Sequence, residues 1–342
     1  MNVIVTGGGT GGHFYPAFII YSKINLKDNA KNVYYLGSDY GIEKRLAFEL
    51  KLNYKLTKAR GFIGKTLFHK IMSLILNFFS FLYCCFFIIS KNIDVVVATG
   101  GYVSLPALAA AVLLQKKIFI QEQNSYPGIT TKIFGRFAER IFISFDESKK
   151  YITAPAKKFM VINTPVRDEF YLLKSNIQKK NIAVVGGSQG SKILNEILFE
   201  SLDFFRENKI TVHWITGRQF YEKYKACSDE FIKVYEYCND IHKLLTAAEI
   251  IISRAGATSI AEFRILNKKV LFIPFAAATH NHQYYNAVSY CKNHQSDYIT
   301  EKELNRFVFI DKLQKLINSS EKKNEEQYKE NSAQIIADIV IA

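Results

Sequence analysis

Short apolar segments alternate with longer segments of helical spacing along this chain. They lie at residues 2–6, 33–37, 95–99, 118–121 and 141–144 in the first half, and at residues 181–185, 211–216, 233–237, 250–253 and 270–274 in the second. They are rich in Val and Ile, as expected of strands that are buried on both faces. Alternation of such strands with helices is typical of parallel sheets covered by helices. The pattern therefore predicts an α/β fold.

A strand followed by a glycine-rich turn and a helix occurs twice. Residues 2–6 lead into the glycines of residues 7–12, and residues 181–185 lead into residues 186–191. This repetition predicts two Rossmann-like domains, each a doubly wound parallel sheet, that face a cleft. The length of 342 residues is also suitable for about two domains. We expect the domains at residues 1–163 and 164–324.

The chain is strongly basic, with 45 Lys and Arg residues against 31 Asp and Glu residues and a formal net charge of +14. Such a surface favours an anionic partner, which is a phosphorylated metabolite, an anionic lipid surface or a nucleic acid. The basic residues are spread along the whole chain, which argues against a nucleic-acid motif. The five cysteines include no C-x-x-C pair, so we expect neither a disulfide framework nor a zinc ribbon.

One apolar segment differs from the others in length. Residues 71–89, which begin with Ile71 and end with Ile89, contain only two serines, one asparagine and one tyrosine among apolar residues. The segment reaches the lower range of length for a membrane-spanning helix, but spanning would divide one domain across the bilayer. A buried crossover helix is a second interpretation. We favour a third, in which the helix lies on an anionic membrane surface while nearby lysines such as Lys70 and Lys91 contact lipid head groups.

Four glycine-rich or small-residue turns follow predicted strands. They lie at residues 7–12, 99–104, 186–191 and 254–259. Each would place backbone N–H groups and a helix N-terminus at the carboxyl edge of a sheet, where phosphate groups bind. Four such turns favour two ligands that each carry phosphate.

The first of these turns also allows a different interpretation. Gly7-x-Gly9-x-x-Gly12 matches the dinucleotide fingerprint, so a nicotinamide-dependent oxidoreductase is an alternative. That class requires an acidic residue at the end of the next strand, and Asp39 lies past the end of that strand. The match is therefore weak when it is taken alone.

Six motifs occur along the chain in a specific order. They are TGGGTGGH at residues 6–13, GGYVS at 100–104, EQN at 122–124, PVR at 165–167, GGSQG at 186–190 and NHQ at 281–283. In this order and spacing they resemble the MurG family, the bacterial UDP-N-acetylglucosamine transferases of glycosyltransferase family 28 that convert lipid I to lipid II. The match extends from residue 2 to about residue 290.

The resemblance implies an architecture and a location. The family has the GT-B fold, with two Rossmann-like domains and a last helix, here at about residues 325–342, that packs back on the first domain. It also implies a peripheral protein on the cytoplasmic face of the bacterial plasma membrane that acts in peptidoglycan and cell-wall synthesis. Its substrates would be UDP-GlcNAc and lipid I.

The implied reaction joins the C4 hydroxyl of the muramoyl sugar of lipid I to C1 of GlcNAc, with inversion, and releases UDP. It requires a base for the hydroxyl proton and groups that meet the charge of the leaving diphosphate. By resemblance, His13 is the candidate base. Glu122 is either a rival base or a residue that orients the acceptor, and the sequence leaves both alternatives open. Acceptor contacts are expected from Gly100, Gly101, Tyr102 and Ser104.

The resemblance places UDP-GlcNAc mainly on the second domain. Glu262 is expected to accept hydrogen bonds from the ribose hydroxyls, and Gln283 to contact the GlcNAc hydroxyls. Arg167 is expected to offset diphosphate charge or to contact the nucleotide. The other donor contacts are expected from Thr10, Gly11, Gly12, Asn124, Ser188, Cys238, Ala257, Thr258, Ser259, Ile260 and Ala261.

Several residues limit or modify this interpretation. The sequence contains no Asp-x-Asp pair, so we expect no obligatory protein-bound metal, while Mg²⁺ on the diphosphate stays open. Four positions depart from the family pattern, at Gln121, Thr164, Asn239 and His282. The nearest alternative function is another GT-B enzyme with a lipid acceptor, such as a diacylglycerol glycosyltransferase. The loop of residues 100–104 argues against it.

Overall fold

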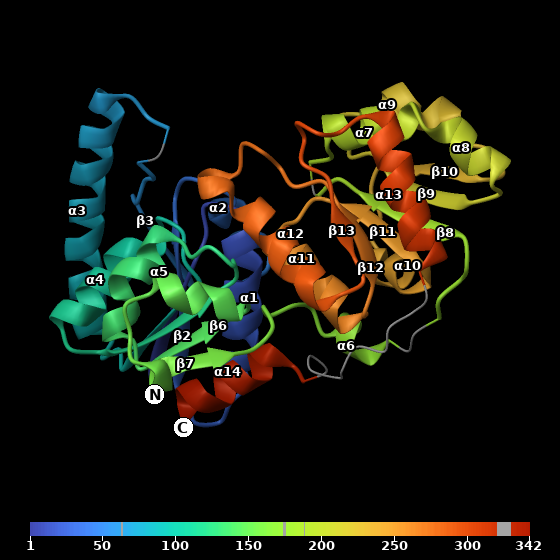
Figure 1. Ribbon diagram of the computed structural model, residues 1–342. Helices are drawn as coiled ribbons and strands as arrows, with labels where there is room; N and C mark the ends of the chain where they lie inside the picture. The colour runs from blue at the N-terminus through green and yellow to red at the C-terminus, as the bar shows by residue number, and fades with distance from the viewer. Residues whose placement is uncertain (63, 174–175, 188, 320–329) are drawn as a thin grey trace. The chain divides into compact units, whose positions relative to one another are not determined.

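The structure is a computed structural model that describes residues 1–62, 64–173, 176–187, 189–319 and 330–342 (Figure 1). The chain divides into two compact units. The first comprises Met1–Arg167 together with Glu330–Ala342, and the second comprises Asp168–Lys329. Arg167 is thus the last residue of the first unit before the chain enters the second.

The first unit contains a parallel sheet that, within residues 1–62 and 64–167, has seven strands in the order β3-β2-β1-β4-β5-β6-β7. The strands are β1 (Asn2–Thr6), β2 (Asn32–Ser38), β3 (Tyr54–Thr57), β4 (Val95–Ala98), β5 (Lys117–Glu122), β6 (Arg140–Ile143) and β7 (Phe159–Val161). Alternate residues of β1 enter different cores, with Val3 and Val5 on one face of the sheet and Ile4 on the other. Burial on both faces explains why these strands read as continuous apolar runs.

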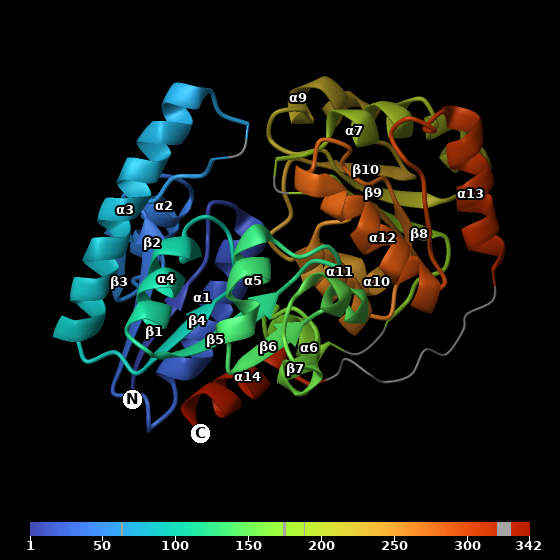
Figure 2. The same cartoon turned by 60° about the vertical axis from the view of Figure 1, so that its left-hand side comes forward.

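Helices cover both faces of this sheet. They are α1 (Gly11–Asn25), α2 (Glu43–Glu49), α3 (Leu67–Ser90), α4 (Ser104–Leu113), α5 (Ile129–Phe134) and α14 (Ser332–Ile341), with short 3₁₀ turns η1 (Gly135–Phe137), η2 (Asp146–Tyr151) and η3 (Ala156–Lys158). The C-terminal helix α14 packs against α1, and its Ile336 and Val340 share one core with Ile20 of α1 (Figure 2). The end of the chain therefore completes the first unit.

The second unit repeats the same plan. Among its described residues, six parallel strands lie in the order β10-β9-β8-β11-β12-β13. They are β8 (Asn181–Val185), β9 (Thr211–Ile215), β10 (Ile232–Tyr235), β11 (Ile250–Ser253), β12 (Lys269–Phe272) and β13 (Asp297–Tyr298). The helices are α6 (Glu169–Leu172), α7 (Lys192–Phe199), α8 (Leu202–Glu207), α9 (Tyr221–Tyr224), α10 (Ile241–Ala247), α11 (Ala257–Ile265), α12 (His282–Asn293) and α13 (Arg306–Asn318), with η4 (Lys225–Cys227) and η5 (Thr279–Asn281).

The strand order of each sheet determines which glycine-rich turns are neighbours. In the first sheet the chain runs from β1 outward to β2 and β3, then returns to β4 on the other side of β1. In the second sheet β8 and β11 have the same relationship. The turns after β1 and β4 are therefore neighbours, and so are those after β8 and β11. Such switch points at the carboxyl edge of a doubly wound sheet are where ligands bind. The predicted α/β fold with two doubly wound sheets is confirmed.

Candidate functional site

The turn after β1 is held rigidly against the turn after β4. Gly9 has a φ of +85°, and Gly100 and Gly101 have φ values of +94° and +79°, a region that side chains rarely adopt. A Cβ atom at Gly101 would collide with the carbonyl oxygen of Gly8. Close approach of the two backbones thus explains why both turns need glycine.

His13 lies in the first turn of α1, where these two turns meet. Its ring lies against Gly100 and Gly101, and its Nδ1 is 2.9 Å from the carbonyl oxygen of Thr99. The Thr99 hydroxyl donates to the carbonyl oxygen of His13 at 2.7 Å, so two hydrogen bonds join the same pair of residues. The Thr99 carbonyl therefore fixes the imidazole, and the Thr99 hydroxyl fixes the main chain of His13.

The partner of Nδ1 also decides the tautomer of His13. A carbonyl oxygen can only accept a hydrogen bond, so Nδ1 must carry the hydrogen. In the neutral ring the lone pair is then on Nε2. The Thr99 carbonyl accepts a second hydrogen bond, from Nε2 of the buried Gln123 at 2.6 Å, which holds that acceptor in position. This arrangement is suitable for a base that takes a proton at Nε2.

The other predicted residues of the acceptor loop have different environments. The ring of Tyr102 lies against Gly9 and Gly61, and its hydroxyl donates to the Tyr40 carbonyl oxygen at 2.8 Å. Burial, and after it the nearby Glu43 carboxyl, raises the pKa of Tyr102 to about 12. Ser104 is fully buried, and its hydroxyl donates to the Gly100 carbonyl oxygen at 2.8 Å. The structure therefore places Ser104 beneath the loop as a support.

Glu122 ends β5 and is almost completely buried. Its Oε1 accepts hydrogen bonds from the backbone and side-chain nitrogens of Asn124, at 2.9 and 3.3 Å. Its Oε2 accepts from the Gly128 N–H at 3.0 Å and from the Thr131 hydroxyl at 2.6 Å. Both carboxyl oxygens are thus used to fix the segment between β5 and α5, including Asn124. Of the two roles left open by the sequence, this geometry favours orientation.

Sequence reasoning missed Glu43, the first residue of α2. Its side chain is fully buried next to the Gly7–Gly12 turn, and its Oε1 accepts a hydrogen bond from the Gly9 N–H. Burial raises the pKa of Glu43, partly offset by hydrogen bonds to backbone N–H groups. No local pattern marks this residue, because it occupies a helix start that is typical of exposed acidic residues.

In the second unit, the turn after β8 crosses the turn after β9. Gly190 and Gly217 have φ values of +77° and +84°, and each occupies the space that a Cβ atom on the other would need. Beneath them, Nδ2 of Asn195 donates to the Thr216 carbonyl oxygen at 3.0 Å, and Nε1 of Trp214 donates to Oδ1 of Asn195 at 2.8 Å. The candidate Ser188 lies outside the described residues.

The turn after β11 leads directly into α11, with Gly256 as its N-cap. Thr258 and Glu262 are four residues apart and so share one face of this helix. Glu262 is half-buried. Oγ1 of Thr258 is buried and has no hydrogen-bond partner among the described residues. The side chains of Ile260 and Ala261 are buried in the unit, so only their main chain can contact a ligand.

Arg254 connects the loops that surround α11. Its Nη1 lies 2.6 Å from Oε1 of Glu301 and donates to the Ile273 carbonyl oxygen at 2.9 Å. Its guanidinium also lies 5.4 Å from the ring centre of Phe275. The N–H of Phe275 donates to Oε1 of Gln283 at 3.0 Å. The Gln283 amide NH₂ can then donate hydrogen bonds to another group. These contacts hold Gln283 in a definite orientation.

Two further candidates are Cys238 and Arg167. Cys238 follows β10 and is half-buried, and burial raises the pKa of its thiol. Arg167 is exposed. Among the described residues, no group of three or more His, Cys, Asp or Glu side chains could hold a metal ion.

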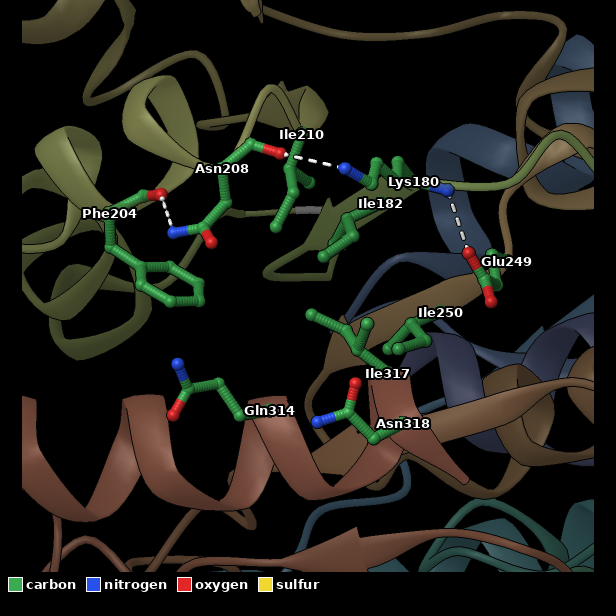
Figure 3. Close-up of a pocket in the computed structure, with 10 residues that line it drawn as sticks. All are labelled: Lys180, Ile182, Phe204, Asn208, Ile210, Glu249, Ile250, Gln314, Ile317 and Asn318. Carbon is green, nitrogen blue, oxygen red and sulfur yellow. Dashed lines mark hydrogen bonds between the residues drawn. The ribbon is translucent and has the colours of Figure 1, made fainter. Parts of the chain in front are cut away.

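A cavity of about 250 Å³ lies in the second unit, at the opposite edge of the sheet (Figure 3). Ile182 and Ile250, from the amino ends of β8 and β11, form part of its wall, and the amides of Gln314 and Asn318 project toward it from α13. It therefore lies at the sheet edge opposite the glycine-rich turns of the second unit and is not part of the candidate site.

Comparison with known proteins identifies the family. The N-terminal domain of glycosyltransferase family 28 matches residues 3–143, and the C-terminal domain of that family matches residues 181–340. The chain is 32% identical over 340 residues to the UDP-N-acetylglucosamine–N-acetylmuramyl-(pentapeptide) pyrophosphoryl-undecaprenol N-acetylglucosamine transferase of Finegoldia magna, covering 95% of this chain and 92% of that protein. The protein of the same name from Syntrophus aciditrophicus is 34% identical over 323 residues, covering 92% and 89%.

Solved structures show the same fold. The crystal structure of Acinetobacter baumannii MurG matches with a TM-score of 0.77 and 24% identity over 99% of each chain. The UDP-GlcNAc 2-epimerase of Methanocaldococcus jannaschii matches with a TM-score of 0.65 and 12% identity over 99% of each chain. The alternative of a nicotinamide-dependent oxidoreductase is set aside by the family matches. The chain has the GT-B fold and belongs to glycosyltransferase family 28 and, within it, to the MurG family.

Proposed function

We propose that this chain transfers GlcNAc from UDP-GlcNAc to the C4 hydroxyl of the MurNAc sugar of lipid I (undecaprenyl-pyrophosphoryl-MurNAc-pentapeptide), with inversion at C1, and so makes lipid II. The observation that carries this proposal is the likeness, over 92–95% of the chain, to relatives named for this transfer. The enzyme is then a UDP-GlcNAc-dependent hexosyltransferase of peptidoglycan synthesis.

His13 acts as the general base. As the bond between the acceptor oxygen and C1 of GlcNAc forms, the bond from C1 to the diphosphate breaks, and the hydroxyl proton moves to Nε2 of His13. The hydrogen bond from Nδ1 to the Thr99 carbonyl supports this role, because it leaves the lone pair on Nε2 and stabilises the ring when it becomes charged.

Glu122 positions the acceptor side of the site. Its four hydrogen bonds to Asn124, Gly128 and Thr131 support this role over that of a second base, since each oxygen already accepts from two donors. Gly100, Gly101 and Tyr102 form the loop that contacts the acceptor, and Ser104 supports that loop from below. Thr10, Gly11 and Gly12 complete the site around His13.

UDP-GlcNAc binds to the second unit. Glu262 accepts hydrogen bonds from the ribose hydroxyls, and the main-chain N–H groups at the start of α11 face the diphosphate, where the helix dipole favours negative charge. The buried, unpartnered hydroxyl of Thr258 supports a polar ligand at this helix start. Gln283 contacts the sugar through its amide. Further contacts come from Arg167, Ser188, Asn124, the main chain of Cys238, and Ala257, Ser259, Ile260 and Ala261.

The lipid acceptor requires the enzyme to work at a membrane, and α3 is suitable for the contact. It is the one helix, within the described residues, that is long and apolar enough to cross a bilayer, and 33% of its most apolar window is buried. The side chains that it buries include Ser73, Asn77 and Ser80, whereas Phe78 and Phe79 are 57% and 59% exposed. Cys84, Phe87 and Ile88 are also buried, so the helix is attached to the first unit, while its outward face is an exposed apolar surface. A surface of this kind typically binds a partner or a membrane.

We therefore propose that α3 lies on the anionic surface of the cytoplasmic face of the plasma membrane, as part of a peripheral protein. Nδ2 of Asn77 donates to the Arg60 carbonyl oxygen at 2.9 Å, and Oδ1 of Asn77 accepts from the Arg60 N–H at 3.0 Å, so the inward face is attached to the first unit. Lys70 and Lys91 are exposed near the two ends of the helix and can meet lipid phosphates.

The test is release of UDP from UDP-GlcNAc with and without a lipid I analogue, in the wild-type protein and in His13→Ala and Glu262→Ala. We expect turnover only with the analogue, a lower kcat in H13A and chiefly a higher donor KM in E262A. Glu200→Ala, at an exposed glutamate of the same unit, is the matched control and should behave as wild type. Absence of UDP release with a competent acceptor would contradict the proposed function.

A further inference from the structure

Glu43 is a carboxylic acid with no exposed surface. Among the residues that the structure describes, its Oε2 has no hydrogen-bond partner from another residue. Burial of a carboxyl group costs free energy, so its presence here indicates a role that offsets that cost. The mechanism described above does not use it.

Two turns meet at the Glu43 carboxyl group, and a third lies next to one of them. The Gly9 N–H, in the turn after β1, donates to Oε1. A Cβ atom at Gly8 or at Gly41, in the turn after β2, would overlap the carboxyl group. The Tyr102 ring, from the turn after β4, lies against Gly9 on the same turn. Glu43 therefore fills the space between the turns after β1 and β2, and Tyr102 connects the first of these turns to the turn after β4.

The turn that Glu43 holds leads directly to His13. Gly9 is joined to Thr10, and the Thr10 carbonyl oxygen accepts hydrogen bonds from the N–H groups of His13 and Phe14, at 3.2 and 3.0 Å. A displacement of Gly9 would therefore carry Thr10 and the first turn of α1 with it. The imidazole would then move relative to the Thr99 carbonyl that fixes its tautomer.

We propose that Glu43 is a positioning residue for the transfer reaction, whose buried carboxyl oxygen anchors the Gly9 turn and thereby sets the position of the His13 imidazole. This inference rests on the proposed function. It predicts that turnover depends on a Glu43 side-chain oxygen that can accept a hydrogen bond from the Gly9 N–H. It also predicts that turnover does not depend on the negative charge of that side chain. The unpartnered Oε2 supports this distinction, because a charge there has no counterpart among the described residues.

Glu43→Gln and Glu43→Met separate the two properties. All three side chains are unbranched and of similar length; Gln keeps an oxygen that can accept from the Gly9 N–H, while Met fills the space without one. The measurements are kcat, the KM for UDP-GlcNAc, and amide hydrogen exchange of the segment 7–13. Glu49→Met, at an exposed position at the end of the same helix, is the matched control.

We expect kcat of E43M to fall at least about tenfold, since small misplacements of reacting groups are costly in rate. E43Q should stay within about threefold of wild type by the same reasoning. The donor KM should change much less than kcat in both, because the proposed donor contacts are mainly on the second unit. Exchange of residues 7–13 should become faster in E43M only, and E49M should match wild type in every measurement.

Two results would overturn the inference. Equal kcat and exchange in E43M and wild type would show that Glu43 only fills space. Equal losses in E43Q and E43M would show that charge is what matters. If E43M does not fold, Glu43→Leu replaces it in the same comparison. If the wild-type protein releases no UDP, the proposed function fails, and the exchange experiment alone decides whether Glu43 anchors the turn.

Discussion

Nδ1 of His13 lies 2.9 Å from the carbonyl oxygen of Thr99, and the Thr99 hydroxyl donates back to the carbonyl oxygen of His13 at 2.7 Å. This reciprocal pair joins the first turn of α1 to the end of β4. It orients the imidazole and fixes the hydrogen on Nδ1, which leaves the lone pair of the neutral ring on Nε2 for the proposed proton transfer.

Replacement of His13 by alanine should remove the base without loosening the donor site. We expect kcat to fall by about 10²–10⁴-fold, the usual contribution of a positioned general base. The KM for UDP-GlcNAc should change little, because the proposed donor contacts are mainly on the second unit. Steady-state kinetics of UDP release test this, and a rise in donor KM at constant kcat would contradict the assignment.

Gly101→Ala should damage the site through the backbone. Gly101 has a φ of +79°, and a Cβ atom there would meet the Gly8 carbonyl oxygen. We expect the free energy of unfolding to fall by about 1–3 kcal/mol and kcat to fall with it. Gly64→Ala is the matched control, because Gly64 has a φ of +74° and its Cβ position is open. Urea titration of both variants isolates the collision from the backbone strain that they share.

Glu122→Gln distinguishes a positioning role from a base. Each Glu122 oxygen accepts two hydrogen bonds, so the NH₂ of Gln must face donors in either orientation. We expect the free energy of unfolding to fall by about 1–3 kcal/mol, with a smaller loss of kcat than in H13A. Glu139→Gln, at an exposed position, serves as the control. Unchanged stability with complete loss of turnover would indicate that Glu122 is the base.

Phe78→Glu should weaken membrane binding while leaving the fold intact. Phe78 is 57% exposed on α3, and the loss of one inserted aromatic ring should lower binding to anionic vesicles by about tenfold or more. The melting temperature should stay close to that of wild type, because the substitution is at the surface. Phe199→Glu, at a residue that is 51% exposed in the second unit, should bind as wild type. Co-sedimentation of wild-type protein that shows no binding would contradict the proposed membrane face.

His294 should make the protein less stable as the pH falls. Burial lowers the pKa of His294 to about 4, and the ring stacks on Tyr290 at 4.0 Å between ring centres. The unfolded chain therefore binds this proton first, and stability is lost between about pH 6.5 and pH 4. The loss is on the order of 2–3 kcal/mol, and no further loss from this group occurs below that range.

The measurement is urea unfolding of wild type and His294→Gln across this pH range. The variant should show a shallower decline, because glutamine does not titrate. Parallel curves for the two proteins would contradict the prediction.

Local sequence was sufficient for the architecture and for the motifs. Apolar runs punctuated by glycine mark β1, β4, β8 and β11, because a strand buried on both faces and a tight turn each have a signature within a few residues. The strands β3, β7 and β13 were not predicted, because they lack the run of Val and Ile that marks β4 and β11, strands that also have only four residues. The resemblance that identified the family likewise depended on short motifs and their spacing.

Tertiary structure decided what each side chain does. The apolar run in α3 could not say which face turns inward, and only packing against Arg60 and Gly61 placed Ser73 and Asn77 inside. Ser104 and Glu122 form their hydrogen bonds within their own loops, but only the folded structure shows that both side chains are buried there. Glu43 is joined to Gly9 across 34 residues. Sequence determines local conformation, but hydrogen-bond partners and burial depend on contacts between distant segments, which exist only after the sheet has formed.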